Sequence, residues 1–186
     1  MSRTARDVVL HLATYNRDAN AEMYAALSLL TDLARKRETG SWFGSIHGIA
    51  NHALVADLYW LRRYRALSSD SAVLNDPRLS PPGLSWQGFL HDDFADMRAT
   101  RAYVDERIVD WFTEFPVGRY GEAFRYEDSR GISRHAVADR AFEFLFVHQI
   151  HHRAQVSQIL DQLGIPNNYA DNGVYIEAKQ GEPHPS

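Results

Sequence analysis

The sequence predicts an all-α fold, a four-helix bundle built as a single domain over residues 1–186. Four segments repeat apolar residues at three- and four-residue steps, which is the pattern of amphipathic helices. The segments between them hold clusters of Pro, Gly, Ser and Asp, which are typical of loops. A chain of this length can bury a substantial core without disulfides. Four long helices of this kind bury their apolar stripes against one another, as bundles do.

The first two helices are predicted over residues 6–35 and 46–67. The first ends before the charged segment 36–40, which terminates in glycine, and the second ends at a loop over residues 68–83. Glu22 is the one polar interruption in the first stripe. That stripe consists of Val8, Leu12, Tyr15, Ala19, Ala26, Leu30 and Leu33.

The third helix is predicted to begin near Ser85, a residue type that caps helices, and to end at Pro116. Residues 119–134 are expected to form either a small hairpin or a long loop. The fourth helix is predicted over residues 137–163, because a glycine and a proline follow it closely. The polar segment 168–186 is expected to be a partly ordered tail.

Composition excludes several classes of protein. The net charge is -4 and the arginines are scattered, so we expect no nucleic-acid partner. The chain has no cysteine, so any metal must be held by nitrogen and oxygen ligands. No apolar run approaches the roughly 20 residues that span a bilayer. No apolar signal segment follows the N-terminus, so we expect a soluble cytoplasmic protein without a membrane partner.

Two histidines interrupt the apolar stripe of the fourth predicted helix. His148 and His152 are four residues apart, so they lie one turn apart on the same face and can hold one metal ion. The same spacing occurs in zinc metalloproteases, where a glutamate follows the first histidine. Gln149 occupies that position here, which disfavours peptidase chemistry.

His52 is the expected third ligand. It interrupts the stripe of the second predicted helix, between Ile49 and Ala56, and bundles build metal sites from side chains on facing helices. A single buried histidine is usually only a hydrogen-bonded core residue. Three neutral imidazoles without a metal leave donors and acceptors to satisfy, at a cost of about 1–3 kcal/mol each. The sequence therefore predicts a divalent-metal site at His52, His148 and His152.

Other polar residues near this site are interpreted differently. His151 falls on the flank of the stripe, and His47 lies about 140° around the helix from the third ligand. Gln155 could hold a water or a neighbouring imidazole, or make a core hydrogen bond. Asp57 and Glu143 could orient a ligand imidazole, but we expect them to be solvated carboxylates.

The aromatic residues are interpreted mainly as packing residues. These are Trp42, Phe43, Trp60 and Trp111, whereas Tyr59 and Phe144 could either shape a pocket beside the metal or belong to the plain core.

Two segments resemble motifs of the DinB family of damage-inducible, YfiT-like proteins, which is unrelated to the DNA polymerase that shares the name. Residues 41–52, Ser-Trp-Phe-Gly-Ser-Ile-His-Gly-Ile-Ala-Asn-His, resemble the second-helix motif. Residues 147–155, Val-His-Gln-Ile-His-His-Arg-Ala-Gln, resemble the fourth-helix motif, commonly Asn-His-x-x-His-His-Arg-Gly-Gln. The departures at Val147 and Ala154 fall outside the ligand positions. Helix order and length also match, so the resemblance spans nearly the whole chain.

The resemblance implies a four-helix bundle that holds a nickel- or zinc-type ion on His52, His148 and His152. Some members of the family are thiol-dependent transferases or isomerases that use low-molecular-weight thiols. Many members have no established activity, so membership does not define a reaction.

Two classes of function fit these observations. Three histidines leave a coordination position for water or substrate, which favours a divalent-metal-dependent enzyme, either a thiol-dependent S-transferase or isomerase or, second, a hydrolase. The thiol would be a cosubstrate, because the chain has no cysteine. The alternative is a non-catalytic metal-binding or stress-response bundle, which a fourth ligand from Asp171, Glu177 or His184 would favour. The high aromatic content and the frequency of twofold assemblies also predict a homodimer.

Overall fold

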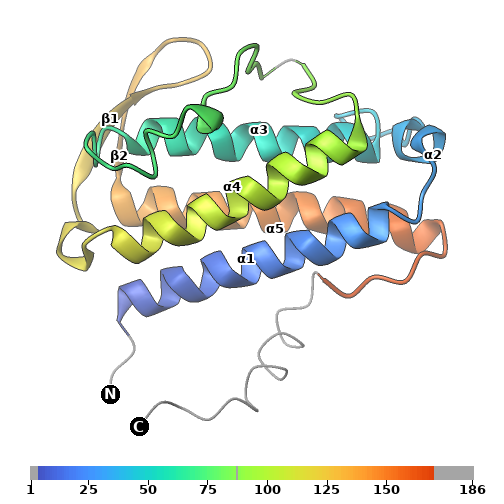
Figure 1. The fold of residues 1–186 in the computed structure, drawn as a ribbon, viewed down its shortest axis with the longest axis horizontal. Helices are drawn as coiled ribbons and strands as arrows, with labels where there is room; N and C mark the ends of the chain where they lie inside the picture. The colour runs from blue at the N-terminus through green and yellow to red at the C-terminus, as the bar shows by residue number, and fades with distance from the viewer. Residues whose placement is uncertain (1–3, 87, 170–186) are drawn as a thin grey trace, which may run out of the picture.

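The computed structural model describes residues 4–86 and 88–169 and shows a mainly helical fold with one small antiparallel hairpin. The long helices are α1 (Ala5–Leu27), α3 (Ile46–Tyr64), α4 (Phe94–Glu114) and α5 (Ala138–Gln162). They lie side by side in Figure 1, where α1 packs against α4 and α5, and α3 packs against the same two helices. The mainly helical fold predicted from the sequence is therefore confirmed.

Short elements connect the long helices. These are α2 (Asp32–Lys36), the 3-10 turns η1 (Pro77–Leu79) and η2 (Val117–Arg119), and the strands β1 (Ala123–Glu127) and β2 (Ser133–Val137). The two strands pair from Ala123 opposite Val137 to Glu127 opposite Ser133. Of the two possibilities left open before the last helix, the hairpin is the one observed. It lies at one end of the molecule, where β1 contacts α3 and β2 contacts α5 (Figure 1).

The first predicted helix is in fact two helices. Ser28 caps the end of α1, and the side chain of Thr31 accepts a hydrogen bond from the backbone of Ala34 to begin α2. The Arg35 guanidinium donates to the carbonyl of Leu27, so a cation satisfies the end of α1. Leu33, which continued the apolar periodicity, is 84% exposed, so the prediction of one helix over 6–35 was wrong.

The third predicted helix begins eight residues later than expected from the sequence pattern. Asp93, and not Ser85, caps α4 by accepting from the backbone of Asp96 at 3.0 Å. The preceding loop is held by α3, where Asn51 accepts from the backbone of His91 and donates to its carbonyl, both at 3.0 Å. His47 donates to the same carbonyl at 3.0 Å. Asn51 and His47 therefore occupy backbone groups of His91 that a longer α4 would need for its own helical hydrogen bonds.

The last predicted helix is confirmed, since α5 ends at Gln162 and Gly164 follows with a φ of 69°. The predicted tail falls almost entirely outside the described residues, although Tyr169 is buried. Across the described residues, no helix is both long and apolar enough to cross a membrane.

A charged network lies inside the helical core. Arg101 of α4 donates to Asp57 of α3 at 2.7 Å and to Asp105 at 2.8 and 3.0 Å. Asn20 of α1 joins Asp105 to Arg153 of α5 through its amide. The network therefore connects all four long helices. Asp57 is completely buried, so the expectation that it is a solvated carboxylate was wrong.

Candidate metal centre

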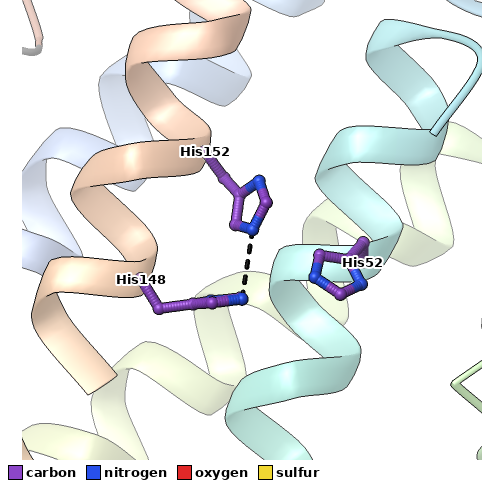
Figure 2. A group of neighbouring side chains, drawn as sticks. All are labelled: His52, His148 and His152. Atoms are coloured by element: carbon purple, nitrogen blue, oxygen red, sulfur yellow. Dashed lines mark hydrogen bonds between the residues drawn. The ribbon is translucent and has the colours of Figure 1, made fainter. Parts of the chain in front are cut away.

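The structure brings the three predicted histidines together. His52 extends from α3, and His148 and His152 extend from α5 toward it (Figure 2). One ring nitrogen from each residue lies within 4.8 Å of the others. The Nε2 atoms of His148 and His152 are 3.1 Å apart. In the part of the chain that the structure describes, this is the only group of three or more His, Cys, Asp or Glu that could hold a metal ion.

Burial keeps these imidazoles neutral. Desolvation, together with the charge of neighbouring imidazoles, lowers the pKa of His52 to about 4 and that of His148 to about 3. Desolvation also lowers the pKa of His152. A neutral imidazole has a lone pair on one ring nitrogen, which is the form that binds a metal. The three rings are therefore in the ligating state at neutral pH.

Gln155 sets the tautomer of one ligand. Its Oε1 accepts a hydrogen bond from Nδ1 of His152 at 2.8 Å, so Nδ1 carries the proton and Nε2 presents its lone pair. The Nδ1 atom of His148 is buried and has no hydrogen-bond partner in the described part of the chain. Three convergent imidazoles without a carboxylate are a donor set suited to zinc or nickel and unsuited to calcium or magnesium. The residues present therefore fit a divalent transition-metal ion.

Aromatic rings cover the outer side of His52. Phe43 stacks on its imidazole with ring centroids 4.1 Å apart, and it also meets His152 edge-on at 5.4 Å. Trp86 lies 6.2 Å from His52 on another side. These rings belong to a pocket of about 370 Å³ that is lined also by Trp42 and Phe89, with no charged side chain in its lining. The three-histidine group thus meets an aromatic pocket through His52.

The close approach of Phe43 depends on a glycine. A Cβ atom added at Gly48, in the first turn of α3, would lie 2.0 Å from the carbonyl oxygen of Phe43. Only glycine lets the backbone before α3 fold down onto the helix at this point. Sequence analysis treated Phe43 as a packing residue and did not detect this contact, although Gly48 sits in the segment that carries the family resemblance.

The remaining candidates take other places. His151 is exposed on the flank of α5, and His47 is buried against the loop before α4, so neither belongs to the group. Glu143 is exposed, as expected. Trp42 is 94% exposed and lines the rim of the pocket, so its interpretation as a packing residue was wrong.

Gln149, the residue in place of a proteolytic glutamate, is buried and has a structural contact. It donates to the carbonyl of Ala53 at 3.0 Å and so joins α5 to α3 at the residues directly after His148 and His52. Sequence reasoning used Gln149 only to disfavour peptidase chemistry. Its position between the two ligand helices indicates that it holds them at the spacing that the site requires.

The fold and the site together define a class, a helical protein with a three-histidine group that could hold a metal ion between two of its helices. Comparison with known families then identifies the family to which the chain belongs. Residues 1–184 match the DinB family, so the chain belongs to this family. No curated protein and no solved structure matched the chain.

Proposed function

We propose that His52, His148 and His152 bind one divalent ion, nickel or zinc, and that the protein is a metal-dependent enzyme acting on a small molecule. The observation that carries this proposal is that the three neutral imidazoles converge and that one of them, His52, also lines a pocket of about 370 Å³. Structural zinc sites are closed by four protein ligands, whereas catalytic sites leave a position for water or substrate. Within the described residues, no fourth His, Asp or Glu joins the group. The tail candidates Asp171, Glu177 and His184 lie outside the described residues.

The reaction that fits best is a thiol-dependent transfer or isomerisation. A bound divalent ion supplies Lewis acidity, which favours the deprotonated form of a thiol at neutral pH. The chain has no cysteine, so the thiol is a cosubstrate. The chain's own residues keep the imidazoles neutral, orient His152 through Gln155 and exclude water with Phe43. The aromatic pocket takes the apolar part of the electrophilic substrate.

We place the protein among single-domain four-helix bundles and propose that it forms a homodimer. The four long helices each contact two of the others, which supports the bundle assignment. The outer side of α5 exposes the apolar residues Phe144, Val147 and Ile150. Such a face suits a twofold interface, and light scattering at micromolar concentration measures it directly.

Elemental analysis tests the metal site. Protein purified without an affinity tag or added metal should contain about one equivalent of nickel, zinc or a similar ion per chain. His148→Ala and His152→Ala should each abolish this content. His151→Ala is the matched control, because it removes an exposed histidine from the same helix. Full occupancy in both ligand variants would overturn the assignment.

A turnover assay tests the reaction class. The holo protein and its His52→Ala variant are compared on a panel of small thiols with a generic electrophile, and on esters and amides. Metal-dependent consumption of thiol and electrophile together supports the proposal. Turnover of esters alone would replace it with a hydrolase. No turnover, together with an ion fully coordinated by protein in a metal-bound structure, would replace it with a non-catalytic metal-binding protein.

A further inference from the structure

A second pocket, of about 310 Å³, lies between the C-terminal half of α3 and strand β1. Three arginines line it: Arg62 and Arg63 from α3, and Arg125 from β1. None of the three forms an ion pair with a carboxylate in the part of the chain that the structure describes. Most other arginines of the hairpin and of α4 do have such a partner. The pocket therefore has cationic groups available to a ligand.

The acidic residues of this lining do not cancel that charge. The negative charge of Asp128 is already compensated within the hairpin. Its carboxylate accepts hydrogen bonds from Arg134 at 3.0 Å and from the backbones of Arg130 and Ile132 at 2.9 and 3.0 Å. These contacts lower the pKa of its carboxyl. Among the described residues that line the pocket, Glu127 is then the one carboxylate left to face the three arginines, and the pocket keeps a positive excess.

Arg63 is held in a fixed position at the inner side of this pocket. Its guanidinium lies over the rings of Trp60 at 4.7 Å and Tyr126 at 4.8 Å, and its Nε donates to the carbonyl of Glu127 at 3.3 Å. Burial lowers the pKa of this guanidinium below its ordinary value. Among the described residues, its terminal nitrogens have no hydrogen-bond partner. A half-buried, preorganised guanidinium of this kind binds oxyanions such as carboxylate and phosphate well.

Trp86 links the arginine pocket to the histidines. Its ring stacks on Tyr59 at 4.3 Å, lies 5.7 Å from the Arg63 guanidinium carbon and lies 6.2 Å from the His52 ring. His52, Tyr59 and Arg63 also follow one another on one face of α3, at steps of seven and four residues. One aromatic side chain therefore separates the cationic pocket from the proposed metal ligands.

We propose that the arginine pocket binds the carboxylate or phosphate group of a small extended molecule whose other end reaches the three histidines. The anion site stands on its own geometry, whereas its place as a subsite rests on the proposed function. The cation-lined pocket supplies orientation and affinity at a distance from the reacting end. The substrate or the thiol cosubstrate is accordingly an acidic molecule.

The anion site is tested with succinate and with inorganic phosphate as probes, on metal-free protein at constant ionic strength. Binding is followed by the NMR signals of the Trp60 and Trp86 indoles and the Arg63 Nε group. Saturable shifts at these groups are expected, and Arg125→Gln and Arg62→Gln should each weaken binding at least about fivefold. Whichever probe binds more tightly identifies carboxylate or phosphate as the preferred group.

Arg98→Gln is the matched control, because it removes one exposed arginine from α4 and changes the net charge equally. It should leave the affinity unchanged. The absence of saturable shifts, or an equal loss in the Arg98 variant, would overturn the anion site. Metal content is measured on the same protein, so failure of the metal site is recorded separately from failure of the anion site.

The link to the histidines is tested with ω-mercapto carboxylates of increasing chain length. For a chain long enough to span both sites, zinc loading should tighten binding, and Arg125→Gln should remove much of that gain. An equal gain from zinc in the wild type and in the Arg125 variant would show that the two sites do not act on one molecule. Loss of the zinc effect in every case would instead overturn the metal site.

Discussion

Gln155 accepts a hydrogen bond from the Nδ1 of His152 at 2.8 Å, and this contact leaves the Nε2 lone pair of His152 directed at the other ligands. Partners of this kind fix the orientation and basicity of metal-ligating imidazoles. The amide belongs to the same helix, three residues along, so α5 alone supplies two of the proposed ligands and the group that orients one of them.

We predict that Gln155→Ala lowers the affinity for zinc or nickel by roughly 10- to 100-fold without removing a ligand. The imidazole of His152 would then be free to rotate and to exchange tautomers. Competition with a chelator of known affinity measures the change. Gln158→Ala, an exposed glutamine three residues further along α5, is the control and should bind metal normally. Equal affinity in the two variants would show that Gln155 does not orient the ligand.

A second prediction concerns the contact between α3 and the segment before it. Gly48→Ala places a methyl group 2.0 Å from the Phe43 carbonyl, so the segment must move away from the helix. Overpacking of this kind costs about 1–3 kcal/mol in the free energy of unfolding, which chemical denaturation measures. Gly118→Ala is the control, since an added Cβ there meets nothing within 4 Å. Phe43 also covers His52, so the Gly48 variant should lose metal affinity as well.

The three-histidine group could be predicted from the sequence because helical spacing is a local property. His148 and His152 must share a face wherever α5 lies, and His52 stands out as a polar residue in an apolar stripe. Pairing the two helices needed only the general tendency of bundles to build sites between facing helices. The ligand set therefore depended on short-range geometry and one assumption about packing.

The parts that were missed depend on long-range contacts. The salt bridge between Asp57 and Arg101 needs two residues 44 positions apart to meet at the same depth, which periodicity does not encode. The late start of α4 depends on Asn51 of α3, whose side-chain amide hydrogen-bonds to the backbone of His91 in the loop before α4. A carboxylate in a helical stripe thus looks solvated until its partner is known.

The buried network leads to a third prediction. Arg101→Met would leave the carboxyl groups of Asp57 and Asp105 buried without their cation, and removing one partner of a buried pair costs about 3–5 kcal/mol. Thermal or urea unfolding measures this loss. Arg98→Met, one turn earlier and exposed on the same helix, should change stability little. Similar unfolding midpoints for the two variants would mean that the network contributes little to the folded state.

The last prediction concerns pH and His47, which lies away from the proposed ligands. Burial lowers its pKa below the ordinary value of 6.5, although its Nε2 donates to the His91 carbonyl and the carboxylates of Asp32 and Asp92 act in the opposite direction. Lys36 is the nearby cation.

The unfolded chain therefore binds a proton at His47 more readily than the folded chain, so the contribution of His47 to stability is present above pH 6.5 and is lost as the pH falls below it. His47→Gln should flatten the dependence of unfolding free energy on pH as the pH falls below about 6.5, whatever it does to stability at neutral pH. The readout is the difference in slope between wild type and variant, because every other histidine is common to both. Parallel profiles for wild type and His47→Gln would contradict the prediction.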